Sequence, residues 1–221
     1  MSTPRTAGPT AALAGVPLGV QPAGVWAGRR QLFVRFAGEA ETATLYTADG
    51  LSGELKRLAA RAGVHSIAAS GSDVLANAEY LAAVFSKWTP TLPVMVDTDG
   101  QRPDALSVLG AYITLVQVTV NFGGSEALID RALETIAVAA RGKHDHALVL
   151  APREETSDRQ LLRIVEQGGA ASRGTMIVIH PCPPGDGGSL DRRWAALLEQ
   201  AAGLHGDVRL VLRIPPPVGM R

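Results

Sequence analysis

Hydrophobic residues along the chain follow two alternating patterns. Short apolar runs rich in β-branched and aromatic residues, such as QLFVRF at 31–36, are typical of strands. Longer stretches with apolar residues three and four positions apart, such as 125–142, are typical of amphipathic helices. The predicted strands cover residues 31–36, 64–70, 92–97, 112–120, 146–151, 175–180 and 207–214. The predicted helices cover residues 53–63, 73–88, 125–142, 157–167 and 189–203.

This alternation predicts an α/β fold. Strands that are apolar along their whole length are buried on both faces, which favours a mostly parallel sheet with helices outside it. About seven strands are too few for a closed eight-stranded barrel, so we expect an open or partial barrel. Binding sites in such folds form at the carboxyl ends of the strands. Residues 1–15, rich in Ala, Gly and Pro, predict a flexible N-terminal arm, and residues 16–221 predict a single domain.

Composition narrows the classes of function. The 21 basic and 21 acidic residues balance, and only 5% of residues are aromatic, so a nucleic-acid-binding surface is not expected. No apolar run reaches about eighteen residues, so no membrane partner is expected. The single cysteine, Cys182, excludes an internal disulfide and a metal site built from several cysteines of this chain. We therefore expect a cytoplasmic protein.

Histidines offer two candidate sites, each with a simpler alternative. His144 and His146 would face the same side of a strand and could ligate a metal, but a solvated loop before the strand is favoured. His180 and Cys182 could form a nucleophile pair, but no base or orienting residue is evident. A small packed residue beside a loop histidine is favoured there. Phosphate-loop, dinucleotide-binding and nucleophile-elbow motifs are absent from the sequence.

Three aspartates follow predicted strands. Asp73, Asp97 and Asp99 would lie at one rim of a partial barrel, where like charges would raise the pKa of a carboxyl group. For each one alone, helix capping or turn formation is the favoured reading. Asp73 precedes an amphipathic helix, and the stretch 97–101, DTDGQ, has the composition of a turn.

The order of several motifs over residues 18–221 resembles a known family. The stretch GVQPAGVWAGRRQLFVRFAG, at 19–38, is similar to the opening of radical S-adenosylmethionine proteins of the 7-carboxy-7-deazaguanine synthase type. This resemblance implies a partial (β/α)6-type radical-SAM barrel. The family carries three cluster-binding cysteines directly afterwards, and here those places fall on Glu39, Ala43 and Tyr46. None of the three is a thiolate, so the resemblance implies a protein without an iron–sulfur cluster.

Other family motifs are altered at the strand ends. The cofactor element corresponds to 70–74, a second polar element to 97–101, and a charged pair to Thr119 and Asn121. The family's Gln-Pro falls on His180 and Pro181. The resemblance therefore implies a residual ligand pocket, made of Arg35, Ser70, Gly71, Asp73, Asp97, Asp99 and His180.

Three functions therefore stay open, and the sequence does not decide whether the protein is an enzyme. The first is a degenerate, non-catalytic partner or regulatory subunit, forming a homodimer or a heterodimer with a related enzyme. The second is a module that binds an adenosyl or purine-like ligand, S-adenosylmethionine among them, although no cofactor is expected to be required. The third is an enzyme with new acid/base chemistry, using residues among Glu39, Glu41, Tyr46, Asp73, Asp97 and His180.

Overall fold

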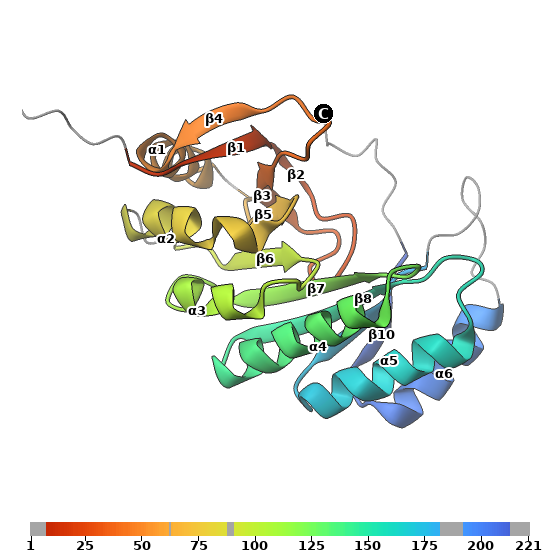
Figure 1. Ribbon diagram of the computed structural model, residues 1–221. Helices are drawn as coiled ribbons and strands as arrows, with labels where there is room; N and C mark the ends of the chain where they lie inside the picture. Colours follow the sequence, from red (N-terminus) through yellow and green to blue (C-terminus); the bar gives the residue numbers. More distant parts are fainter. Residues whose placement is uncertain (1–7, 62, 88–90, 182–191, 213–221) are drawn as a thin grey trace, which may run out of the picture.

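A computed structural model describes residues 8–61, 63–87, 91–181 and 192–212 (Figure 1). Seven strands run parallel to one another: β3 (Arg30–Phe36), β5 (Ser66–Gly71), β6 (Val94–Thr98), β7 (Leu115–Asn121), β8 (Asp145–Ala151), β9 (Met176–Ile179) and β10 (Val208–Leu210). Three more are antiparallel to their neighbours: β1 (Thr10–Gly15), β2 (Leu18–Val20) and β4 (Thr44–Thr47). The helices are α1 (Ala48–Ala59), η1 (Val74–Asn77), α2 (Ala78–Lys87), η2 (Pro103–Ala105), α3 (Leu106–Leu109), α4 (Glu126–Arg141), α5 (Asp158–Ala171) and α6 (Arg192–Leu204).

The strands form one sheet, and its order confirms the expected α/β class. The order is β10-β9-β8-β7-β6-β5-β3-β1-β4, with β2 paired to β3. The parallel strands therefore stand side by side in chain order, as repeated strand–helix units produce. Within the described residues β10 and β4 do not pair, so the sheet is open and not a closed barrel.

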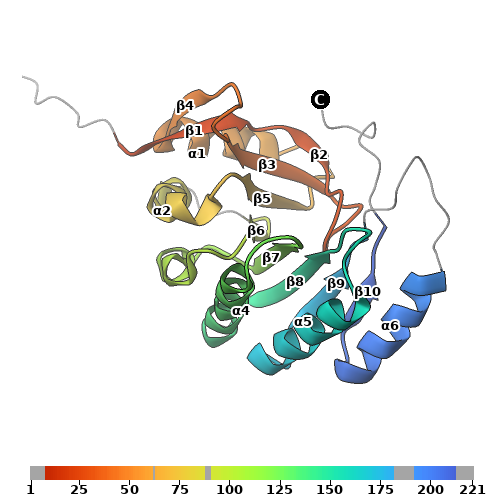
Figure 2. The same cartoon turned by 45° about the vertical axis from the view of Figure 1, so that its right-hand side comes forward.

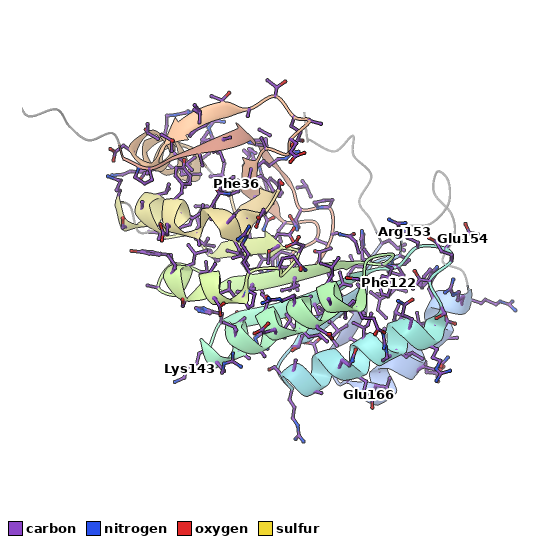
Figure 3. All side chains as sticks on the ribbon, viewed as in Figure 1. Phe36, Phe122, Lys143, Arg153, Glu154 and Glu166 are labelled. Atoms are coloured by element: carbon purple, nitrogen blue, oxygen red, sulfur yellow. The ribbon has the colours of Figure 1, made fainter. Side chains whose placement is uncertain are left out.

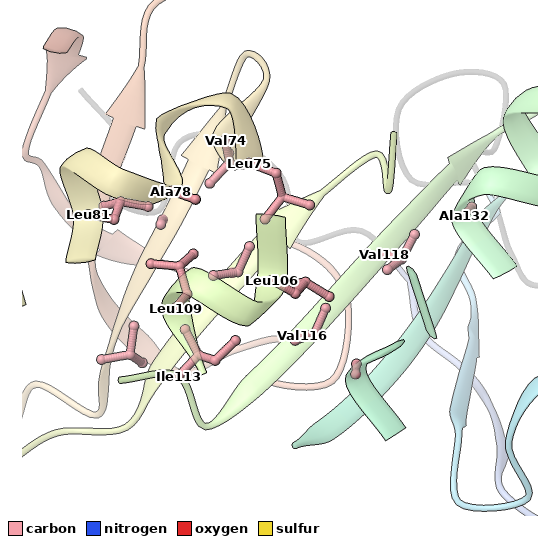
Figure 4. Close-up of a cluster of buried hydrophobic side chains, with 14 of the residues drawn as sticks. Val74, Leu75, Ala78, Leu81, Leu106, Leu109, Ile113, Val116, Val118 and Ala132 are labelled. Atoms are coloured by element: carbon pink, nitrogen blue, oxygen red, sulfur yellow. The ribbon is translucent and has the colours of Figure 1, made fainter. Parts of the chain in front are cut away.

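One face of the sheet packs against the helices (Figures 1 and 2). Because side chains alternate along a strand, every second residue of each parallel strand points to this face. Figure 4 shows Val116 and Val118 of β7 among the side chains of Leu106, Leu109 and Ala132. All of these side chains are almost fully buried, and each contributes roughly 1.5–3 kcal/mol through the hydrophobic effect, alanine less.

The opposite face carries a smaller apolar cluster and none of the described helices, and we call it the helix-free face. Its cluster consists of Phe33, Ala68, Met95, Leu115 and Ala147, with Val25, Trp26 and Met176 packed against it. Val25 and Trp26 belong to the segment 21–29, which two backbone hydrogen bonds of 2.9 Å fold back on itself, joining Gln21 to Arg29 and to Gly28. Through Val25 and Trp26 this segment packs on the apolar cluster of the helix-free face.

The N-terminal part of the chain differs from the sequence-based expectation. Residues Thr10–Gly15, expected to be part of a flexible arm, form β1, in which Leu13 is fully buried. Strand β4 was not expected either, and α1 begins at Ala48, earlier than predicted. Thr47 explains that start, since its side chain accepts a hydrogen bond of 3.1 Å from the backbone of Gly50. Residues 1–7 of the arm lie outside the described residues.

Charged residues mark the two ends of the strands. Figure 3 shows Arg153 and Glu154 after β8, near Phe122 at the end of β7, while Lys143 lies beyond the far end of α4. Among the described residues, no helix is long and apolar enough to cross a membrane.

Candidate functional site

A polar cavity of about 340 Å³ lies at the carboxyl ends of three neighbouring strands, β5, β6 and β7. Its walls are made by Gly71, Ser72, Asp73, Val74, Asp97, Thr98, Asp99, Thr119 and Asn121. The three aspartates predicted to share one rim do line this one cavity. A parallel sheet places successive strand ends side by side, which is why residues far apart in sequence meet here.

Asp97 is the carboxyl group set deepest in the fold. It stands on the helix-free face near the end of β6, partly exposed to the cavity, and burial raises its pKa. Two neutral donors oppose that rise: Gln117, and Thr119, whose hydroxyl donates to Oδ1 over 3.2 Å. For each aspartate alone the sequence favoured capping or turn formation, with a pKa raised by like charges as the alternative. Neither describes Asp97, which lies within β6 and whose pKa is raised by burial.

Asp73, which also lines the cavity, differs from Asp97 because its partner is a cation. Its carboxylate accepts hydrogen bonds from Nε and Nη2 of Arg102, at 2.8–3.0 Å. These bonds to Arg102 hold the pKa of Asp73 below its ordinary value. Its Oδ1 also accepts from the backbone of Ala76 over 3.3 Å, so the predicted capping role is confirmed.

Asp99 forms the predicted turn beside the cavity. Its Oδ1 accepts a hydrogen bond from the backbone of Gln101 over 3.2 Å. Gly100 between them has a φ of +79°, and a Cβ there would come within 2.8 Å of Ala132 and Val118. The turn therefore requires glycine at this position. A smaller recess of about 160 Å³, lined by Asp99, Thr119 and Asn121 among others, extends the cavity toward the start of α4.

Not all of the residual pocket expected from the sequence comes together. Gly71 lines the cavity, but Arg35 pairs with Glu41 at 3.0 Å and does not line it. Ser70, at the end of β5, is not among its lining residues. His180 follows β9, where its Nδ1 lies 2.9 Å from the carbonyl oxygen of Val211. Those three assignments to the pocket are therefore wrong.

The three positions expected to mark a lost cluster site do not converge. Glu39 and Ala43 are exposed, whereas the Tyr46 side chain packs against the hydrophobic core on the helix side. Burial, and then the Glu54 carboxylate, raise the pKa of Tyr46. Glu39 and Ala43 lie in the connection before β4, whereas Tyr46 lies within β4, where it pairs with Ala11 of β1.

The histidine candidates have structural roles. His146 is buried in β8, with Nδ1 2.8 Å from the carbonyl oxygen of His144 and Nε2 2.9 Å from the hydroxyl of Ser172. The favoured solvated-loop reading is therefore wrong for His146. In the described part of the chain, no group of three or more potential metal ligands gathers, so the alternative metal site is not formed either. Cys182 lies outside the described residues.

Gln117 and Arg102 are the site residues that sequence reasoning missed. A signal for the first was present: the stretch 115–121, LVQVTVN, places polar residues at every second position of an apolar strand. That pattern indicates a strand with one polar face, and Gln117, Thr119 and Asn121 all lie on it. Arg102 had no comparable signal, because its role depends on a contact with Asp73 across the cavity rim.

Comparison with known proteins gives no family for the chain. A scan against models of protein families finds no match, and neither does a search of curated proteins. Among solved structures, the chain is similar to the apo form of the 3-keto-D-glucoside 4-epimerase YcjR from E. coli. That match has 14% sequence identity and a TM-score of 0.36, and it covers 77% of this chain and 88% of the other.

These comparisons correct the family suggested by the motif order. No family model supports the resemblance to radical S-adenosylmethionine proteins. The fold agrees with this correction, since Glu39, Ala43 and Tyr46 do not form a common site. The expectation of a degenerate 7-carboxy-7-deazaguanine synthase-like pseudoenzyme is therefore wrong.

Proposed function

We propose that this protein binds a small polar molecule in the cavity at the ends of β5, β6 and β7, in a sheet of partial-barrel type. One observation carries the proposal. The carboxyl group of Asp97 is partly buried on the cavity wall, and its partners are two neutral donors. In the described part of the chain no salt bridge reaches it. A carboxyl group kept from water without a cation costs stability, and such groups concentrate at functional sites.

The charges of the cavity define the class of ligand. Three carboxyl groups line it, and Arg102, the cation that the described residues place at its rim, already pairs with Asp73. The cavity therefore favours a neutral or cationic molecule over an anionic one. Carboxylates accept hydrogen bonds from hydroxyl and amino groups, and the side chains of Thr119 and Asn121 offer both donors and acceptors. A monosaccharide, an amino sugar or a purine nucleoside has this chemistry.

Asp97 is also the group best suited to move a proton. Its raised pKa lies closer to neutrality than that of Asp73, whose pKa is lowered by Arg102. Two carboxyl groups with pKa values shifted in opposite directions can hold different protonation states at the same pH. We therefore assign Asp97 the role of general acid or base toward a ligand hydroxyl or amine, with Asp73 remaining ionised.

Thermal unfolding with a ligand panel tests this proposal. The panel contains monosaccharides, purine nucleosides, amino sugars and, as anionic counterparts, sugar phosphates and dicarboxylates. A ligand at one hundred times its dissociation constant adds about 2.7 kcal/mol of stability. We expect shifts from neutral or cationic members, and their loss in Asp97→Asn but not in Asp130→Asn, which changes an exposed carboxylate on α4. Shifts from anions alone, or shifts that survive Asp97→Asn, would contradict the proposal.

A second candidate function is self-association through the edge strand β4, with a second copy of this chain as the partner. Leu45 of β4 has a side chain that is 75% exposed. Ala12, its partner on β1, accepts a hydrogen bond from Ala37 on the β3 side, so Ala12 and Leu45 form a non-hydrogen-bonded pair. The N–H and C=O of Leu45 therefore point to the free edge, where a second β4 can pair with them.

Sedimentation measurements of the full chain test self-association. Antiparallel pairing of two β4 strands about Leu45 brings the two leucine side chains together. We expect Leu45→Lys to shift the population to monomer, because like charges would then face each other. Leu204→Lys is the matched control, since Leu204 is 48% exposed at the end of α6, away from β4. A monomeric wild-type protein at high concentration would overturn this candidate.

A further inference from the structure

Gln117 is a polar side chain in the middle of the sheet, only 1% exposed. Its Oε1 accepts a hydrogen bond of 3.1 Å from the backbone N–H of Val25. Gln117 and Asp97 are register partners on the neighbouring parallel strands β7 and β6, so their side chains stand side by side on the helix-free face. Because Oε1 is taken by Val25, the NH₂ group is the part of the amide that can serve the Asp97 carboxyl group, whose pKa Gln117 lowers. The Val25 N–H therefore fixes which way the amide lies, and the NH₂ group faces Asp97.

Gly24 leaves room for the side-chain amide of Gln117. The backbone of Gly24 has a φ of +86°, a conformation that favours glycine. A Cβ at this position would overlap the Gln117 side-chain amide, so the amide occupies the space that a side chain at 24 would need. The segment 21–29 is in turn anchored by Val25 and Trp26, which pack on the apolar cluster of the helix-free face.

We propose that Gln117 is a positioning residue, which orients the Asp97 carboxyl group toward the cavity and links it to the segment 21–29. The inference rests on the proposed function, because Asp97 is the group that meets the ligand there. The position of the Val25 backbone determines the orientation of the Gln117 amide. The amide in turn determines the orientation of the Asp97 carboxyl group. A change in the segment 21–29 is thus transmitted to the Asp97 carboxyl group through Gln117.

Among the described residues, the other charged groups that face Asp97 or share its side of the sheet have partners or lie elsewhere. Asp73 and Asp99 share its cavity, and Arg102 is engaged by Asp73. On the same face of the outer strands, Arg35 is paired with Glu41 and His180 lies beyond β9. Thr119 is the second donor to Asp97, so removing Gln117 leaves one hydrogen bond in place.

Carbon-13 NMR titration of the ligand-free full chain provides the test. The Asp97 side-chain carboxyl carbon is assigned by its loss in Asp97→Asn, and its pKa is followed in each variant. Removing a donor to the ionised form raises a carboxyl pKa. We expect Gln117→Met to raise the pKa of Asp97. We expect Gly24→Ala to raise it too, because the new Cβ displaces the Gln117 amide, whose atoms are the nearest ones to that Cβ.

Gly63→Ala is the control for Gly24→Ala. Gly63 has a similar φ of +77°, so alanine introduces the same backbone strain, but the nearest atom to its Cβ is an Arg30 nitrogen at 3.5 Å. We expect the pKa of Asp97 to be unchanged in this variant. An equal rise in Gly63→Ala, or no rise in both Gln117→Met and Gly24→Ala, would overturn the inference.

A measurement on the wild-type protein needs no variant to fold. The side-chain amide proton and nitrogen resonances of Gln117 should shift with pH, with the same midpoint as the Asp97 carboxyl carbon. If the Gln117 amide resonances do not shift as Asp97 ionises, the positioning role is refuted. These titrations use no ligand, so their failure is distinct from a failure of the ligand panel.

Discussion

Arg102 and Asp73, which lie 29 positions apart in the chain, meet at the rim of the cavity in a two-pronged ion pair. The guanidinium group lowers the pKa of Asp73 and removes one negative charge from the cavity. Both side chains are about half exposed, so the pair governs the cavity's charge more than the stability of the fold.

The first prediction concerns acid stability. A carboxyl group whose folded-state pKa lies below its ordinary value of 3.8 stabilises the fold above that value, and this contribution is lost as the pH falls through the folded-state pKa. When the pH is lowered from neutrality to 3, Arg102→Ala should therefore lose less of its free energy of unfolding than the wild type does. Urea unfolding across this range measures the effect. Arg102→Lys keeps the charge but not the two-pronged geometry. Its loss of stability on acidification should lie between those of the wild type and Arg102→Ala.

The second prediction concerns Asp97 and has the opposite sign. Its folded-state pKa lies above 3.8, so the proton is bound more tightly in the folded protein. The resulting stability is fully present below pH 3.8 and is lost as the pH rises through the folded-state pKa. Relative to the wild type, Asp97→Asn should gain stability as the pH rises from 3 to neutrality. Urea unfolding of the two proteins in parallel gives this difference, and a difference that does not vary with pH contradicts the assigned burial.

The third prediction concerns Gly71 at the end of β5. Its φ is +104°, and a Cβ would overlap the carbonyl oxygen of Phe36 on the neighbouring strand. Because backbone cannot move aside as a flexible side chain does, Gly71→Ala should destabilise the protein by about 3 kcal/mol or more.

Gly53→Ala is the matched control for this prediction. Gly53 lies inside α1, and a Cβ there meets nothing within 4 Å. Alanine should stabilise the helix at this position by roughly 0.5–1 kcal/mol. Thermal unfolding of both variants decides the matter, and a Gly71→Ala protein as stable as the wild type would show that β5 does not approach Phe36 closely.

The fourth prediction concerns a buried hydroxyl group. Tyr80 on α2 is 4% exposed, and no atom of the described residues hydrogen-bonds its hydroxyl. Burial, with a smaller effect of Tyr46, raises the pKa of Tyr80 to about 12. Removing an unsatisfied buried hydroxyl relieves a desolvation cost, so Tyr80→Phe should be neutral or stabilise by up to about 1 kcal/mol.

Tyr46→Phe provides the contrast to Tyr80→Phe. The Glu54 carboxylate is close enough to raise the pKa of the Tyr46 hydroxyl, and removing that hydroxyl should cost up to about 1.5 kcal/mol. Urea unfolding of both proteins tests the pair of expectations. A larger loss in Tyr80→Phe than in Tyr46→Phe would mean that the Tyr80 hydroxyl has a partner.

Hydrophobic periodicity predicted the parallel part of the fold well. All seven parallel strands correspond to predicted apolar runs, because burial on both faces leaves a continuous signal in the sequence. The antiparallel edge was missed for the converse reason. Strand β4 is short and mostly exposed, and β1 is built largely of alanine, so neither shows a strong pattern. Their pairing is decided by tertiary contact.

The site was predicted in part. Asp73, Asp97 and Asp99 were predicted to lie together because each is at the end of a predicted strand, and strand ends of a parallel sheet share one edge. All three do line one cavity. The roles of Gln117 and Arg102 depend on partners 92 and 29 residues away, which periodicity does not encode. The family resemblance failed because motif spacing records local order along the chain. It did not test whether Tyr46 and Ala43 face the same space.

The cavity lining falls between Gly71 and Asn121, and the segment that underlies it ends at Arg29. Strands β8 to β10 and the helices α5 and α6 add no residue to this wall, although they complete the sheet and its core. If the cavity binds a ligand as proposed, recognition falls to the part of the chain that ends at Asn121, and the described elements from β8 onward serve as scaffold. Under this proposal, substitutions that preserve burial from β8 onward leave the cavity lining unchanged, whereas substitutions between Gly71 and Asn121 can alter both its shape and its chemistry.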